Sequence, residues 1–67
     1  MQLSARNQLK GRVTSVTTGA VMAEVVVAVR DQEVVAAITR TSAENLSLAA
    51  GDEVTVVIKA TEVILAK

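Results

Sequence analysis

Hydrophobic and polar positions alternate over much of the chain with the two-residue period that is typical of β-strands. The first strand is expected at residues 8–16. One of its faces carries Leu9, Gly11 and Val13, and the other carries polar residues and, at its end, Val16. Glycine is unusual inside a strand, so Gly11 predicts a bulge or a bend of the kind found at barrel corners.

Four more strands are expected from the same period and from the abundance of Val, Ile and Thr. They span residues 20–30, 33–40, 53–59 and 62–66. In the second strand the odd-numbered positions from Val21 to Val29 are all Ala or Val, which predicts its buried face. A turn is expected at residues 17–19. The loop Asp31-Gln32 predicts a tight hairpin, although it lacks the glycine that two-residue loops prefer.

The period changes after residue 40. Thr41 precedes Glu44 by three positions, which is the spacing of a capping box at the start of a helix. A short helix is therefore expected at residues 42–49, with Leu46 on its inner face. Gly51 is expected to end this helix in the left-handed conformation.

Three strands, a short helix and two more strands predict an all-β fold with one short helix. This order is that of a five-stranded Greek-key barrel of the oligonucleotide/oligosaccharide-binding (OB) type. A small β-sandwich is the alternative. The chain has 67 residues and shows neither a linker nor a repeat, so residues 1–67 are expected to form a single domain.

The missing residue types exclude several functions. The chain has no Cys, His or aromatic residue, and seven basic residues balance seven acidic ones. Without Cys and His, a disulfide framework, a thiolate or imidazole metal site and a His-activated nucleophile are all excluded, so we do not expect an enzyme. Without a basic excess or aromatic stacking platforms, we do not expect nucleic-acid binding.

Membrane association and secretion are not expected either. No apolar run approaches the ~20 residues of a membrane span, and the first residues lack the charged and apolar regions of a signal peptide. A cytoplasmic location is the default that remains.

The small size of the apolar side chains predicts self-association. Val (13) and Ala (11) supply most of the apolar content, and a domain of about 60 residues buries only ~60% of the surface of its unfolded chain. Such a core gives a thin margin over chain entropy. Several strands also carry apolar residues on both faces. We therefore expect an obligate homo-oligomer, whose interfaces cover the second face.

Four polar segments offer hydrogen-bond donors to a small anion: Ser4-Ala5-Arg6-Asn7, Lys59-Ala60-Thr61, Thr17-Thr18-Gly19 and Thr41-Ser42. The last lies at the expected start of the helix, where free N–H groups and the helix dipole favour an anion. Each segment also has a structural interpretation. Ser4 and Thr41 can cap, Gly19 can form a turn, and Lys59 can be solvated.

Two of these segments carry a family resemblance. The chain resembles the molbindins, small cytoplasmic molybdate-binding proteins, in its opening Ser4-Ala5-Arg6-Asn7-Gln8-Leu9-Lys10-Gly11, followed by Val13. It is similar to their second signature in Val57-Ile58-Lys59-Ala60-Thr61-Glu62-Val63. The resemblance covers the whole chain in one copy. The same unit occurs in molybdate transporter ATPases and molybdate-responsive regulators, and a single copy implies the free-standing storage form.

The resemblance implies an OB-type barrel that assembles into a hexamer, a trimer of dimers, with oxyanion sites between subunits. In one class of site, the Ser-Ala-Arg-Asn segment of one subunit meets the Lys-Ala-Thr segment of another. The residues that the resemblance implies for this class are Ser4, Ala5, Arg6, Asn7, Lys59, Ala60 and Thr61. A second class near the three-fold axis implies Thr18, Gly19, Ala20 and Ser42. The Asp31-Gln32 loop departs from the more glycine-rich hairpin of the family.

The chemistry of these residues suits molybdate. This tetrahedral dianion only accepts hydrogen bonds, so its pocket should offer donors and no carboxylate. Phosphate near neutral pH carries a proton, and leaving that proton unpaired costs ~1–3 kcal/mol. Sulfate differs in size alone, and tungstate should bind like molybdate. Arg6 and Lys59 are expected to neutralise the charge, while Ser4 and Thr61 orient the ion.

The leading hypothesis is therefore that the chain binds molybdate and tungstate for storage and homeostasis of molybdenum, with no protein atom bound directly to the metal. The alternative is a structural or regulatory interaction module that senses molybdate. Binding to nucleic acid is the third interpretation.

Overall fold

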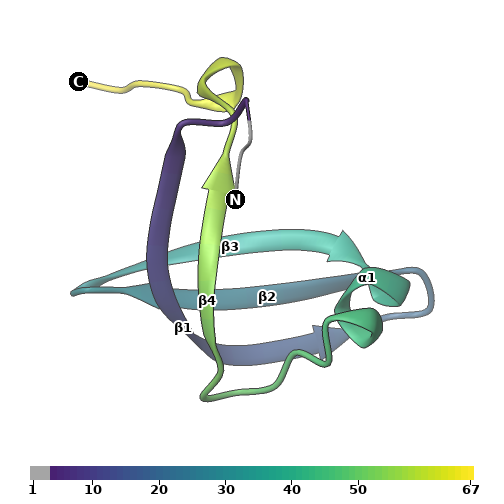
Figure 1. Ribbon diagram of the computed structural model, residues 1–67. Helices are drawn as coiled ribbons and strands as arrows, with labels where there is room; N and C mark the ends of the chain where they lie inside the picture. Colours follow the sequence, from purple (N-terminus) through teal and green to yellow (C-terminus); the bar gives the residue numbers. More distant parts are fainter. Residues whose placement is uncertain (1–3) are drawn as a thin grey trace.

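One bent sheet of four antiparallel strands dominates the computed structural model, which describes residues 4–67 (Figure 1). The elements in chain order are β1 (Asn7–Thr18), β2 (Met22–Val29), β3 (Gln32–Thr39), α1 (Arg40–Asn45), β4 (Glu53–Ile58) and the 3₁₀ helix η1 (Ala60–Glu62). The strand order in the sheet is β3-β2-β1-β4. The strands thus form one sheet and not the two sheets of a sandwich.

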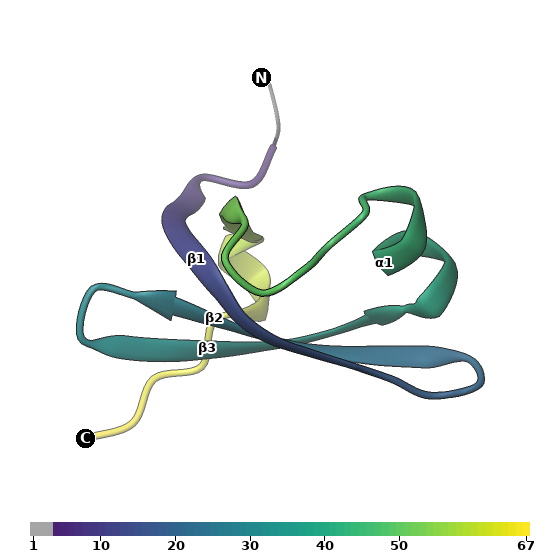
Figure 2. The same cartoon turned by 90° about the horizontal axis from the view of Figure 1, so that it is seen from below.

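Strand β1 is shared between two partners. Residues 7–12 of β1 pair with β4, and residues 12–18 pair with β2. The β2–β3 hairpin consequently runs across the β1–β4 ribbon, as two views at right angles show (Figures 1 and 2). Gly11 permits this crossing, because a Cβ atom there would lie 2.6 Å from both the Ala28 carbonyl oxygen and Val27 Cγ1.

The expected irregularity in β1 lies at Thr14, three residues beyond Gly11. Val13 pairs with Val27 and Ser15 with Val26, so Thr14 is the extra residue of a bulge. The bulge reverses the alternation that comes after it. Val16 therefore packs against the core, and its placement on the polar face from the sequence was wrong.

The core is small and aliphatic. Val13, Val25 and Val27 are buried at its centre, and Val13 is only 1% exposed. Partly buried residues surround them: Val16, Val29, Ala36, Ile38, Leu48, Val54 and Val56. The predicted buried face of the second strand is confirmed from Ala23 to Val27.

The helix begins earlier than the sequence suggested. Thr39 caps it, because the side-chain oxygen of Thr39 accepts a hydrogen bond from the Ser42 N–H at 3.0 Å. The helix ends at Asn45, and Ser47 (φ 51°) lies just beyond it in the left-handed conformation that was expected at Gly51. Leu46 is 66% exposed and does not lie on an inner face.

Gly51 serves a different turn. It has φ 97°, and its N–H donates to the Val13 carbonyl at 2.8 Å, which fixes the approach to β4. The hairpin loop is also displaced by one residue. Val29 pairs with Gln32, so the loop is Arg30-Asp31, and Arg30 adopts φ 57°.

The last expected strand is absent from the described residues. Ala60–Glu62 form η1, and residues 63–67 have no regular structure. Ile64 is 92% exposed and Leu65 is 89% exposed, in a tail that leaves the sheet (Figure 1). A strand needs a neighbour for its N–H and C=O groups, and within residues 4–67 no strand pairs with this segment. The mostly-β class with one short helix is confirmed, with four strands instead of five.

Neither helix of residues 4–67 is long and apolar enough to cross a membrane.

Candidate functional site

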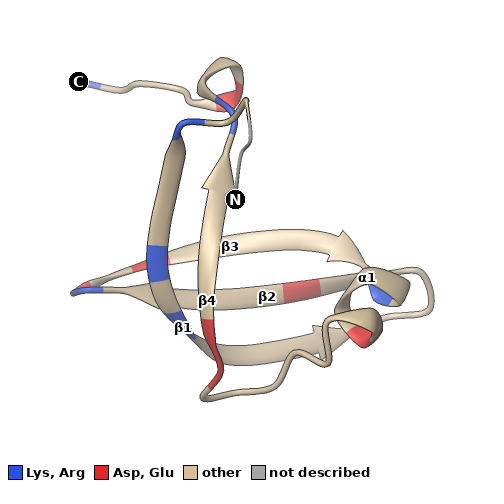
Figure 3. Ribbon diagram, viewed as in Figure 1, with Lys and Arg blue, Asp and Glu red and all other residues tan. Residues whose placement is uncertain are grey.

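Pairing of β1 with β4 brings the two signature segments together. Asn7 lies opposite Ile58, and the Asn7 side-chain amide donates to the Ile58 carbonyl at 3.1 Å. The residues ahead of β1 therefore lie next to the residues that come after β4. Basic residues of both segments gather at this end of the ribbon (Figure 3). We call this group the strand-end cluster: Ser4, Ala5, Arg6, Asn7, Lys59, Ala60 and Thr61.

Ala5 anchors the first segment of the strand-end cluster. It is 7% exposed, and its carbonyl accepts a hydrogen bond from the Gln8 side chain at 3.3 Å. Its neighbours Ser4 and Arg6 are exposed, and Asn7 is half-buried. One small buried side chain thus holds a segment whose polar side chains remain accessible.

The second segment offers unpaired donors. Lys59 is extended, and its carbonyl accepts the Glu62 N–H at 2.9 Å, which turns the chain into η1. In the described part of the chain, the N–H groups of Ala60 and Thr61 donate to no backbone carbonyl. Arg6 and Lys59 also take part in no ion pair among residues 4–67, so Lys59 is not paired with Glu62 there.

The second group of expected residues lies around the start of α1. Thr18 ends β1, and the Gly19 N–H closes the next turn on the Met22 carbonyl at 2.7 Å. The Arg40 N–H donates to the Val21 carbonyl at 2.8 Å, which joins this turn to the helix. We call this group the helix-start cluster: Thr18, Gly19, Ala20 and Ser42.

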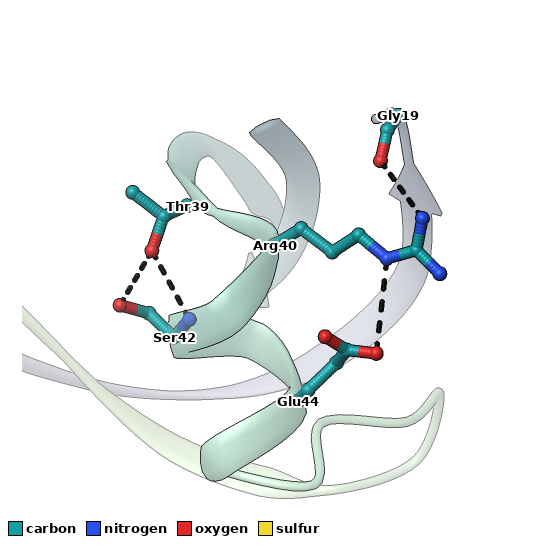
Figure 4. Close-up of polar contacts among 5 residues, drawn as sticks. All are labelled: Gly19, Thr39, Arg40, Ser42 and Glu44. Atoms are coloured by element: carbon teal, nitrogen blue, oxygen red, sulfur yellow. Dashed lines mark hydrogen bonds and ion pairs between the residues drawn. The ribbon is translucent and has the colours of Figure 1, made fainter. Parts of the chain in front are cut away.

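Arg40 is the cation of this region, and reasoning from the sequence missed it. Its guanidinium donates to the Gly19 carbonyl at 3.5 Å and lies 3.7 Å from the Glu44 carboxylate (Figure 4). A basic residue at the end of the expected third strand, just ahead of the expected helix, was the available signal. That signal was hidden because the helix was expected to begin two residues later.

Most polar groups of the helix-start cluster are already paired within the chain. The Ser42 N–H donates to the Thr39 side-chain oxygen, and the two hydroxyl groups lie 2.8 Å apart (Figure 4). The nearby pocket of about 550 Å³ is lined by Arg40, by Glu44 and, among the expected residues, by Ala20. A carboxylate at this pocket disfavours an ion that only accepts hydrogen bonds.

The two clusters can be set beside known proteins. A model of the TOBE domain matches residues 3–65. The chain belongs to the TOBE-domain family. Molybdenum-pterin-binding protein 3 of Clostridium pasteurianum is 46% identical to this TOBE domain over 66 residues, which are 97% of each chain. The molybdenum transport protein ModE of Azotobacter vinelandii is also 46% identical over 66 residues, which are 24% of that protein.

Solved structures agree with these relatives. A molybdate binding protein from Sporomusa ovata matches this TOBE domain with a TM-score of 0.96 and 43% identity, and the match covers both chains completely. The cytoplasmic molybdate-binding protein ModG, solved with molybdate bound, matches with a TM-score of 0.84 and 41% identity over 90% of this chain and 43% of that one. The resemblance to the molbindins is confirmed.

Proposed function

We propose that this TOBE domain, a single domain of residues 1–67, binds molybdate and its analogue tungstate in the cytoplasm. Its role would be storage and homeostasis of molybdenum, without catalysis. The observation that carries this proposal is the strand-end cluster, in which Arg6 and Lys59 lie on adjacent segments and neither forms an ion pair in the described chain. The names of the relatives, which include molybdate-binding proteins, support the same ligand.

The charges and donors of the strand-end cluster suit a fully deprotonated dianion. Arg6 presents a planar fork of N–H donors, and Lys59 adds a compact positive charge. Ser4, Asn7 and Thr61 add side-chain donors, and Ala5 and Ala60 contribute their backbone. Phosphate carries a proton that needs an acceptor, so a cage of donors discriminates against it. The metal keeps its four oxygens, and no protein atom coordinates it.

An exposed cluster needs a cover before it can hold an ion tightly. Charge-assisted hydrogen bonds strengthen where water is excluded, and Arg6 and Lys59 are exposed in the single chain. We propose that a second subunit supplies this cover, so that the sites lie between subunits of a homo-oligomer, a hexamer built as a trimer of dimers. Each ion would then stabilise the assembly through mass action.

The surface of the single chain supports self-association. It exposes 5460 Å², whereas a compact monomer of 7.0 kDa exposes roughly 4,000 Å². Its radius of gyration is 12.3 Å, against about 11 Å for a compact domain of this length. Val35, Met22 and the tail residues Ile64 and Leu65 are large apolar side chains left in solvent. Contact between copies would bury them.

Melting in the presence of oxyanions tests the proposal. Molybdate and tungstate should raise the melting temperature, with about 2.7 kcal/mol of stabilisation when the free ion is at 100 times its dissociation constant. Sulfate and phosphate should have little effect. Native mass spectrometry should count six subunits together with bound ions. Absence of any shift with millimolar molybdate would exclude a storage function.

A regulatory module that senses molybdate is the second candidate. It is favoured by the match to ModE of Azotobacter vinelandii, in which the matched unit is 24% of a longer transport protein. The two functions differ in the use that is made of the bound ion. Storage requires many ions per assembly and their release, whereas sensing requires that the loaded form bind a partner protein that the empty form does not.

A further inference from the structure

A groove on the outer face of the sheet gathers three of the seven basic residues. Its lining includes Lys10, Arg12, Ala28, Arg30, Glu53 and Thr55. Its volume is about 540 Å³, which lies in the range of small-molecule pockets and exceeds the needs of a bare tetrahedral ion. None of these residues belongs to the strand-end or the helix-start cluster.

The strand register explains why these side chains share one face. Lys10 lies opposite Thr55 on β4, and Arg12 lies opposite Glu53 on β4 and Ala28 on β2. In β1 they alternate with Gly11 and the buried Val13, so they are on the side away from the core. The small Ala28 side chain leaves room at the centre of the groove. Figure 3 shows basic segments of β1 near the hairpin end, which carries both basic and acidic residues.

Arg30 occupies its place in the groove at a cost in backbone energy. It is the first residue of the hairpin loop and adopts φ 57°, a left-handed conformation that is unfavourable for an L-residue with a Cβ atom. Glycine adopts it freely and asparagine readily. The two-residue hairpin loop requires a positive φ, and Arg30 stands where glycine or asparagine would adopt it with less strain. Here the side chain adds a positive charge to the groove.

The groove carries more positive than negative charge. Arg12 forms an ion pair with Glu53 at 3.3 Å, and both side chains are largely exposed. Within residues 4–67, Lys10 and Arg30 take part in no ion pair. The lining residues therefore present an excess of two positive charges to a ligand.

We propose that this groove binds the phosphate group of a small phosphate monoester. The guanidinium groups of Arg12 and Arg30 can each donate two parallel hydrogen bonds to phosphate oxygens, and Lys10 adds a point charge. The volume beyond the phosphate accommodates the organic part of the ester. The organic part of the ester separates this ligand from molybdate, because it can fill volume of the groove that a bare tetrahedral ion leaves empty.

Amide chemical shifts of the ¹⁵N-labelled full chain test the proposal. Adenosine monophosphate is the probe, and inorganic phosphate, sulfate and molybdate are titrated separately at constant ionic strength, because salt screens exposed charges. We expect saturable shifts at Gly11, Ala28 and Arg30 with the monoester, and smaller ones with the three inorganic ions. Equal saturation by phosphate or sulfate would overturn the assignment to a monoester. Absence of shifts at millimolar monoester would overturn the site itself.

Two variants of equal charge separate the groove from general electrostatic attraction. Arg30→Gly removes the cation and relieves the left-handed backbone, so we expect at least tenfold weaker binding of the monoester without loss of thermal stability. Lys67→Ala removes one positive charge from the tail and should leave this affinity unchanged. Monoester binding by Arg30→Gly that equals that of the unmodified chain would contradict the proposal. The stabilisation by molybdate should be the same in both variants, which keeps this test independent of the proposed storage function.

Discussion

The two ends of β1 carry the two groups of residues that the sequence nominated for oxyanion binding, and they differ in how many of their donors are free. At the start of β1, the strand-end cluster has two cations without ion pairs and two backbone N–H groups without backbone acceptors in the described chain. Beyond its end, the helix-start cluster lies beside Arg40, a cation that is paired with Glu44, and the N–H of its Ser42 donates to Thr39.

Both clusters contain hydroxyl residues, small residues and a nearby cation. Composition alone therefore ranks them as equals. The feature that separates them is whether local structure has already satisfied the donors. A short helix satisfies its first N–H groups through its cap, whereas a segment that runs past the end of a two-stranded ladder leaves its N–H groups for a ligand or a partner.

Removal of one cation from the strand-end cluster should give the largest effect. Arg6→Ala or Lys59→Ala is expected to weaken molybdate binding about 100-fold, or about 2.8 kcal/mol, because a charged hydrogen-bond partner of a dianion is lost. Isothermal titration calorimetry measures this change, and native mass spectrometry checks that the assembly persists. Arg40→Ala is the matched change beside the helix-start cluster and should lower the affinity for molybdate less than tenfold. A larger loss from Arg40→Ala would reverse the ranking of the clusters.

Both clusters depend on the path of β1, so a change at its crossing with β2 should give the next largest effect. A Cβ atom at Gly11 would lie 2.6 Å from the Ala28 carbonyl oxygen, and backbone cannot move aside as a side chain can. Gly11→Ala is therefore expected to lower the free energy of unfolding by about 2 kcal/mol in urea denaturation. Gly19→Ala is the control, because its nearest contact would be 3.3 Å. Equal stability of the two variants would show that the crossing tolerates a side chain.

Much of this path was predictable from local sequence. The period of two placed the first four strands to within a few residues, since alternation depends only on which face is buried. The residues of the strand-end cluster were named from the family resemblance, which implied that its two segments come from different subunits. The pairing of β1 with β4, which brings the two segments together within one chain, was not predicted. Gly11 signalled a distortion in β1, although the bulge itself lies at Thr14.

Other features depend on partners that the sequence does not name. The bulge moved Val16 to the core, and only pairing with β2 creates that bulge. Thr39 and Thr41 are both plausible caps, and the choice between them depends on where β3 ends. Val63 and Ile64 have strand-forming side chains, but no strand of the described residues pairs with them. The sequence pattern gives the tendency of a segment to form a strand or a helix. Whether that strand or helix forms depends on the segments that are available to pair or pack with it.

The cap of α1 offers a sharper test of the helix-start cluster. Thr39→Ala removes the acceptor of the Ser42 N–H and should destabilise the fold by about 1 kcal/mol, as measured by thermal or chemical unfolding. The same change frees that N–H but does not alter the strand-end cluster. The affinity of the strand-end cluster for molybdate should therefore be unchanged in Thr39→Ala. Thr41→Ala is the control and should cost less, because Thr41 does not cap the helix. Greater destabilisation by Thr41→Ala would place the cap where the sequence first suggested it.

The smallest expected effect comes from the carboxylate beside Arg40. Glu44→Gln removes an exposed ion pair with a separation of 3.7 Å, which is worth only about 0.3 kcal/mol of stability. It also removes the negative charge that lines the helix-start pocket. If that charge disfavours an oxyanion there, native mass spectrometry at high molybdate concentration should show additional ions bound to Glu44→Gln. Glu24→Gln makes the same change of charge on β2, outside both clusters, and should leave the number of bound ions unaltered. Additional ions in both variants would mean that the net charge of the protein controls how many ions bind. The pairing of donors at the start of the helix would then not be the controlling feature.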